Sequence, residues 1–170
     1  MDENVKRITS ALSAAVQTER DGQHFYRMAL ASMEDEKGRE VFGLLAEEEK
    51  QHEKFLLAQH KSFTEEGKAD PNAVLGSATE FSGDHPIFSE KILGRIGTAH
   101  NEMAALGVGI QLELASQNYY RIQAEEAPAM EVKVFFEALA EWESNHYHAL
   151  LTQQESLKEH YWSKNGFAPF

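Results

Sequence analysis

Hydrophobic residues along this chain recur at alternating spacings of three and four, the period of a helix with one buried face. No segment shows the regular alternation of polar and apolar residues that a half-buried strand requires. The pattern predicts four long helices, at residues 4–33, 37–66, 97–126 and 130–159. Only a few residues separate the first helix from the second and the third from the fourth, so each pair is expected to form an antiparallel hairpin.

The connection between the two hairpins, residues 67–96, has a different composition. It begins with an irregular stretch, rich in turn residues, that contains Pro71, Gly76, Gly83 and Pro86. A short helix is expected at residues 87–93. A connection of this length can cross a bundle from end to end, which accounts for its irregular part. We therefore predict an all-α fold, a single domain over residues 1–170, in which a long crossover joins two helical hairpins at residues 4–66 and 97–159.

The second hairpin repeats the first at a displacement of 94 residues. Identical residues recur at this displacement along both helices of the hairpin. They include the pairs Leu12 and Leu106, Glu19 and Glu113, Tyr26 and Tyr120, Phe42 and Phe136, Glu49 and Glu143, His52 and His146, and Leu56 and Leu150. Matches at one fixed offset indicate a duplicated hairpin, whose two copies are related by a pseudo-twofold axis.

Each helix carries a charged residue at a position where its apolar stripe requires a hydrophobic one. In the second helix the stripe reads Phe42, Leu45, Glu49, His52 and Leu56. The fourth helix repeats it as Phe136, Leu139, Glu143, His146 and Leu150, and the first and third helices carry Glu19 and Glu113 in their stripes. Burying an isolated carboxylate is costly, so these charges must be compensated inside the bundle.

A pair of metal ions would provide this compensation. Two divalent ions neutralise four glutamates, and each Glu-x-x-His motif presents both of its side chains on one helix face. A single motif of this kind is common on a solvated helix surface, but two copies in register with the apolar stripe favour a metal site. The predicted ligands are Glu19, Glu49, His52, Glu113, Glu143 and His146. Oxygen-rich ligation with one histidine per ion suits iron or manganese better than zinc or copper, and the choice between these two metals stays open.

Tyr26 and Tyr120 lie on the same stripes, two turns after Glu19 and Glu113. Their hydroxyl groups are candidates for orienting a ligand carboxylate or carrying a proton to it. The alternative is an ordinary core tyrosine whose hydroxyl has a hydrogen-bond partner.

Composition excludes several other classes of protein. The net charge of −12 disfavours nucleic acid and anionic membrane surfaces as partners. The chain has no cysteine, so disulfides, thiolate zinc sites and iron–sulfur clusters are excluded. There is no apolar run typical of a signal peptide or a membrane span, and we expect a cytoplasmic protein. The aromatic tail, residues 160–170, is expected to dock on the bundle or across a subunit interface.

The six candidate ligands and their spacing resemble those of the ferritin-like superfamily of carboxylate-bridged di-iron proteins, and most of all its rubrerythrin branch. The resemblance covers residues 4–159. It implies a ferritin-like four-helix bundle with two iron ions (Fe²⁺/Fe³⁺), bridged by Glu49 and Glu143. It further implies that Glu19 and His52 complete the coordination of one ion, and that Glu113 and His146 complete the coordination of the other.

The chain departs from the rubrerythrin pattern in two ways. It lacks the cysteine-rich rubredoxin domain, so the resemblance implies an external electron donor such as a rubredoxin-type protein. It also has Ser116 where rubrerythrins carry a second glutamate one turn after the lone one. The leading hypothesis is an oxidoreductase, a homodimer that reduces hydrogen peroxide or O₂. The alternatives are a ferroxidase, an iron storage or delivery protein, and a metal-binding bundle without catalysis.

Overall fold

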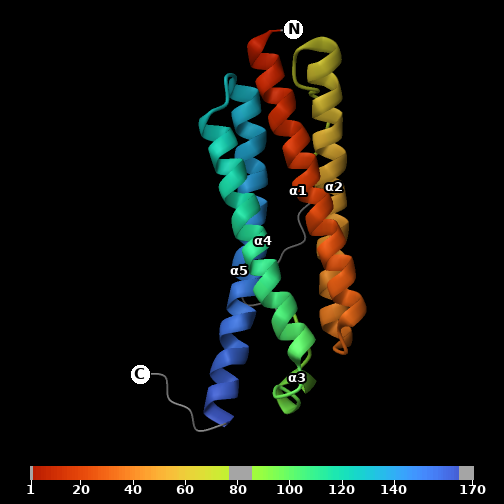
Figure 1. Ribbon diagram of the computed structural model, residues 1–170, viewed down its shortest axis with the longest axis vertical. Coiled ribbons are helices and arrows are strands. Elements are labelled where there is room, and N and C mark those ends of the chain that lie inside the picture. The colour runs from red at the N-terminus through yellow and green to blue at the C-terminus, as the bar shows by residue number, and fades with distance from the viewer. Residues whose placement is uncertain (1, 77–85, 165–170) are drawn as a thin grey trace.

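Four long helices lie side by side in the computed structural model, which describes residues 2–76 and 86–164 (Figure 1). They are α1 (Glu3–Ser32), α2 (Glu36–Glu66), α4 (His100–Glu125) and α5 (Met130–Lys164), and a short helix, α3 (Lys91–Gly94), precedes α4. Within the described ranges there is no strand. The predicted all-α four-helix bundle is confirmed.

The helices form two antiparallel hairpins, α1 with α2 and α4 with α5. Figure 1 shows that α2 ends beside the N-terminus, whereas α3 lies at the opposite end of the bundle. The connection between them therefore spans the length of the bundle, and α2 and α4 run in the same direction. Part of this predicted crossover, residues 77–85, lies outside the described residues.

The short helix is smaller than the sequence pattern predicts. It begins at Lys91, and the expected residues before it are not helical. Ile87 and Phe88 are nevertheless buried, with exposed fractions of 2% and 4%. Phe88 packs so closely on α2 that a Cβ atom at Gly38 would clash with its ring. The apolar residues of this segment therefore serve to dock the crossover on the bundle.

The last helix is longer than predicted. It continues beyond residue 159 to Lys164, so the first residues of the expected tail are helical. The Lys158 ammonium lies 5.6 Å from the ring centroid of Trp162, one turn later, which favours this extension. Trp162 and the exposed Tyr161 line a surface hollow beside Ile96. Residues 165–170 of the tail lie outside the described residues.

A buried polar cluster ties the start of α4 to the turn between α1 and α2. The Glu102 carboxylate accepts hydrogen bonds from the backbone N–H groups of Glu34 and Asp35, at 3.1 and 3.2 Å. It also pairs with the Arg95 guanidinium at 2.5 Å. Asp35 in turn accepts from the backbone N–H groups of Ser89 and of the first turn of α2. These bonds satisfy both buried carboxylates and hold the two hairpins together at this end.

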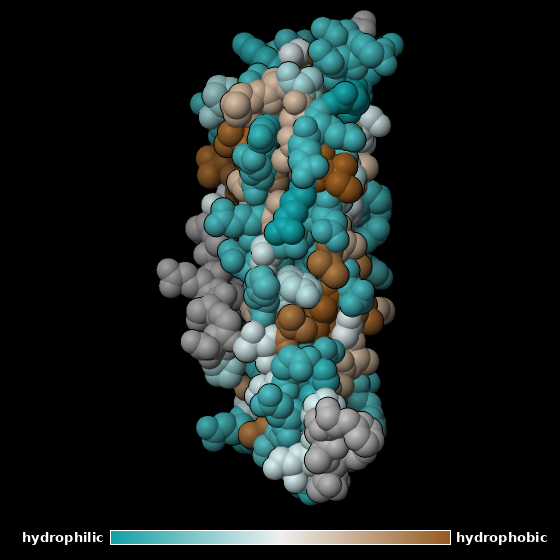
Figure 2. Space-filling view, turned by 90° about the vertical axis from the view of Figure 1, so that its left-hand side faces the viewer, coloured by the Kyte–Doolittle hydropathy of each residue, from teal (hydrophilic) through white to brown (hydrophobic). Residues whose placement is uncertain are grey.

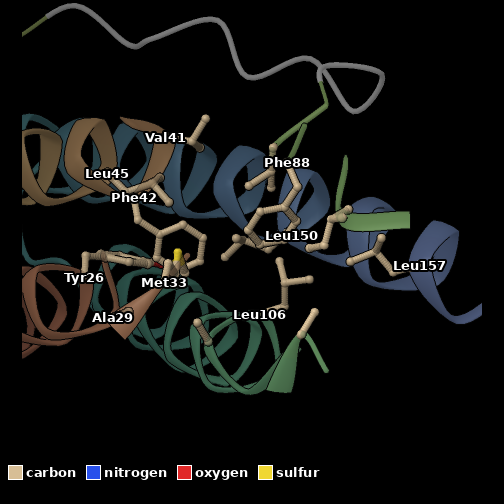
Figure 3. Close-up of a cluster of buried hydrophobic side chains, with 14 of the residues drawn as sticks. Tyr26, Ala29, Met33, Val41, Phe42, Leu45, Phe88, Leu106, Leu150 and Leu157 are labelled. Carbon is tan, nitrogen blue, oxygen red and sulfur yellow. The ribbon is translucent and has the colours of Figure 1, made fainter. Parts of the chain in front are cut away.

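The hydrophobic core consists of two clusters, one toward each end of the bundle. One contains Tyr26, Met33, Phe42, Leu45, Phe88, Leu106 and Leu150 (Figure 3). The other contains Leu12, Ala15, Leu56, Tyr120, Phe136 and Leu139. On each of the four long helices, the predicted metal ligands lie in the stretch between the two clusters. The site is therefore enclosed by apolar packing on both sides.

Among the described residues, the face of the molecule formed by α4 and α5 carries no hydrophobic cluster as large as the two in the core. Figure 2 shows that hydrophobic residues on this face lie in small groups among hydrophilic ones. None of the described helices carries an apolar stretch of the length and hydropathy needed to cross a membrane.

Candidate metal centre

The six predicted ligands meet in the middle of the bundle. Glu19 comes from α1, Glu49 and His52 from α2, Glu113 from α4, and α5 contributes the fourth carboxylate and second imidazole. All six residues are buried, with exposed fractions of at most 4%. The apolar stripes thus bring four carboxylates and two imidazoles together, as their spacing predicts.

Two overlapping groups of ligand atoms can each hold one metal ion. One is formed by Glu19, Glu49, His52 and Glu143, and the other by Glu49, Glu113, Glu143 and His146. Within each group the ligand atoms all lie within 4.8 Å of one another. Glu49 and Glu143 belong to both groups, so their carboxylates lie where a bridge between two ions would lie.

Both histidines direct Nδ1 toward this cluster. His52 Nδ1 lies 3.2 Å from a Glu19 oxygen and 3.5 Å from a Glu143 oxygen. His146 Nδ1 lies 3.6 Å from a Glu113 oxygen and 3.9 Å from a Glu49 oxygen. The imidazole rings stack with centroids 6.3 Å apart. Nδ1 is therefore the nitrogen that each ring offers to an ion.

The two tyrosines bind ligand carboxylates across the pseudo-twofold axis. The Tyr26 hydroxyl on α1 donates to Glu113 on α4, and the Tyr120 hydroxyl on α4 donates to Glu19 on α1. Both side chains are fully buried. Burial, with the charge of Glu113 next in importance, raises the pKa of Tyr26 well above its usual value, so this hydroxyl keeps its proton. Of the two roles that the sequence leaves open, this geometry favours orientation of a ligand.

Protons compensate the buried charge when metal is absent. Burial and the charges of neighbouring carboxylates raise the pKa of Glu49 and Glu143 well above the usual range, which favours the protonated, neutral form of both carboxyl groups. Burial opposes a charge on His146, but Glu113 and a hydrogen bond to Glu48 raise its pKa to about 10. Burial also opposes a charge on Glu113, yet the nearby carboxyl group of Glu143 and the imidazole of His146 lower its pKa to about 2. Binding of metal must displace these protons.

The donor set fits a pair of divalent metal ions. Glu113 Oε2 and Glu143 Oε1 are buried and accept no hydrogen bond from any described residue. Such atoms are rare in cores unless a ligand satisfies them. The position of Gly22 also matters, because a Cβ atom there would lie 3.4 Å from Glu49 Cδ. The small residue therefore leaves room for the Glu49 carboxylate beside α1.

Glu48 belongs to the centre although the sequence analysis did not single it out. Its exposed fraction is 3%, and its Oε2 lies 2.6 Å from His146 Nε2. The signal for it is present in the sequence, because position 48 is three residues after Leu45 and four before His52. Glu47 is exposed, as is Glu141 at the repeated position. The remaining described histidines are exposed or half-buried and lie outside the centre.

The metal-free protein is expected to lose stability as pH rises from about 6.5 to 10. His146 binds its proton more tightly in the folded chain, with a pKa of about 10, than in the unfolded chain. Its contribution is therefore complete below pH 6.5 and is lost as pH rises through 10, and the raised pKa of His52 acts in the same direction. Thermal melts of chelator-treated protein across this range provide the measurement. A melting temperature that stays constant or rises would contradict the assignment, and His146→Gln should reduce the decline.

Comparison with known protein families agrees with this geometry. The sequence model described as Rubrerythrin matches residues 10–105, which is more than half of the chain. Neither the curated proteins nor the solved structures contain a match.

Proposed function

Because this chain belongs to the rubrerythrin family, we propose that it is a di-iron oxidoreductase that reduces hydrogen peroxide, with O₂ as the other candidate oxidant. The observation that supports this most strongly is the sharing of Glu49 and Glu143 between two groups of metal ligands. Two Fe²⁺ ions held side by side would supply the two electrons that convert one peroxide molecule, with two protons, to two water molecules. Mn²⁺ suits the same ligands.

The residues of the centre then have distinct roles. Glu49 and Glu143 would be shared by the two ions, Glu19 and His52 would hold one ion, and Glu113 and His146 would hold the other. Tyr26 and Tyr120 hold Glu113 and Glu19 in place through their hydroxyl hydrogen bonds. The hydrophobic clusters at both ends of the site limit access to small molecules such as peroxide and O₂.

An external electron donor completes the proposal. The oxidised ions must be reduced after each turnover, and a chain without cysteine carries no iron–sulfur or rubredoxin centre of its own. We therefore expect a separate rubredoxin-type protein to deliver the electrons. We further propose that the chain works as a homodimer in the cytoplasm.

Anaerobic stopped-flow absorbance tests the reaction. Protein loaded with two Fe²⁺ per chain is mixed with H₂O₂ in one series and with O₂ in another. The expected result is oxidation of both ions by one equivalent of peroxide, at least about tenfold faster than by O₂. Faster oxidation by O₂ would favour the ferroxidase. No oxidation by either reagent, at full iron content, would exclude both activities and leave a metal-binding bundle without catalysis.

Iron oxidation for storage or delivery is the second candidate. The observation that favours it is Ser116, a half-buried residue at the position where rubrerythrins carry an additional glutamate. The two candidates differ in capacity, because a store takes up many more than two iron ions per chain. Native mass also separates them: a dimer supports the oxidoreductase, and a cage-sized assembly supports storage.

A further inference from the structure

The two halves of the metal centre differ at one repeated position. At the displacement of 94 residues, Glu48 on α2 corresponds to Trp142 on α5. Each of these side chains lies against the histidine of the opposite hairpin. The Glu48 carboxylate lies 2.6 Å from His146 Nε2, whereas the Trp142 ring lies against the His52 ring with centroids 4.7 Å apart. One imidazole is therefore paired with an anion and the other with an indole.

The carboxylate changes what His146 offers to a metal ion. The Nδ1 atom of His146 faces the cluster, so an ion bound to Nδ1 leaves the ring proton on Nε2. This N–H group then donates a hydrogen bond to the Glu48 carboxylate. This bond fixes the tautomer and the orientation of the ring, and it makes Nδ1 a stronger donor. The ring is then ready to bind before any ion arrives.

His52 has no such support. Its Nδ1 also faces the cluster, so Nε2 must carry the proton when an ion is bound. Nε2 is buried and has no hydrogen-bond partner in the part of the chain that the structure describes. The Trp142 side chain cannot accept a hydrogen bond from this N–H group, because the only polar group of an indole is a hydrogen-bond donor. Metal binding at His52 therefore leaves a buried N–H group without a hydrogen-bond partner, and this cost lowers the affinity of His52 for the ion.

We propose that the two metal positions are unequal and fill in a fixed order. The position of Glu113 and His146 binds a divalent ion first and more tightly, and the position of Glu19 and His52 binds second. Glu48 is the positioning residue that creates the difference, and it acts through His146 without binding the ion itself. This inference rests on the metal binding assumed in the proposed function, but it does not depend on the reaction.

Titration of metal-free protein with Mn²⁺, followed by calorimetry and electron paramagnetic resonance, tests the order. The wild type should bind two ions in two steps that differ in affinity by about tenfold or more. After one equivalent, the spectrum should be that of isolated Mn²⁺ ions, and coupled pairs should appear only with the second. Two equal steps, or coupled pairs from the start, would overturn the order while leaving the metal centre intact.

Substitution of Glu48 identifies the cause. Glu48→Gln keeps the shape of the side chain but removes its charge, and it should weaken the tight step about tenfold or more and leave the weak step unchanged. Glu47→Gln, at an exposed neighbour on the same helix, is the matched control and should change neither step. Equal weakening of both steps, or no difference from the control, would overturn the role of Glu48.

The reciprocal substitution, Trp142→Glu, places a carboxylate beside His52, as Glu48 lies beside His146 in the other half of the centre. It should tighten the weak step and bring the two affinities together. This variant decides the question if Glu48→Gln does not fold, because an unchanged weak step would then contradict the proposal. A wild type that binds no Mn²⁺ or Fe²⁺ would instead contradict the metal centre on which the proposed function depends.

Discussion

Replacing Glu49 and Glu143 together by glutamine is expected to abolish binding of the metal pair and to leave a folded helical bundle. Both carboxylates belong to the two groups of ligand atoms, so the double substitution removes two ligands from each ion. The loss should exceed the roughly 10–100-fold weakening that is typical of changes to residues around a metal site. The bundle should remain folded, because burial already favours the neutral form of both carboxyl groups when metal is absent. Metal analysis of protein purified without chelators, together with circular dichroism, provides the measurement.

The repeat itself offers a matched control for this experiment. Glu47 and Glu141 occur at the same displacement, two residues before each bridging glutamate, and both are exposed. Their replacement by glutamine removes the same charge from the same two helices, and metal content should not change. If the double variant of Glu49 and Glu143 kept two ions per chain, or if the control lost them, the assignment of the ligands would be wrong.

Metal loading is expected to raise the melting temperature by at least roughly 8–16 °C when free metal is about a thousand times the dissociation constant of the tighter position. Binding of one ion to the folded state alone contributes about 4 kcal/mol under this condition, and binding of the second ion adds to it. Each kcal/mol shifts the melting temperature by about 2–4 °C in a chain of this length. The ions replace the protons that compensate the buried carboxylates, so the gain should increase toward alkaline pH, where those protons are lost.

Differential scanning calorimetry with Mn²⁺, and again after chelation, measures this effect. The Glu49→Gln, Glu143→Gln double variant should show no shift, which separates binding at the centre from weak binding to the acidic surface. Equal melting temperatures with and without metal in the wild type would mean that the buried carboxylates are compensated by some other group.

The helices and the buried cluster of six Glu and His side chains could be predicted from sequence because both depend on local periodicity. Spacings of three and four place Glu49 and His52 on the same stripe as Phe42 and Leu56, and burial of that stripe brings the ligands inside. The repeat then supplies the second half of the site. The match to the rubrerythrin family and the buried cluster agree with this prediction, whereas the identity of the metal and the reaction remain proposals.

The features that sequence analysis missed depend on how the hairpins are placed against each other. Tyr26 binds Glu113 of the other hairpin, and no spacing within one helix indicates that partner. Glu48 lies beside a ligand in sequence, but its role depends on His146 from α5. The burial of Glu102 depends on backbone N–H groups at the turn between α1 and α2. Local patterns predict which face of a helix is buried, but they do not predict which side chains and backbone groups of the other helices contact that face.

A crystal structure of the Fe²⁺-loaded protein, with anomalous scattering measured at the iron absorption edge, will show whether these residues hold two ions. Two anomalous peaks are expected inside the bundle, both adjacent to Glu49 and Glu143. One peak should lie beside Glu19 and His52, and the other beside Glu113 and His146. A single peak shared by all six residues, or peaks confined to surface carboxylates, would show that the assignment of a two-ion centre is wrong.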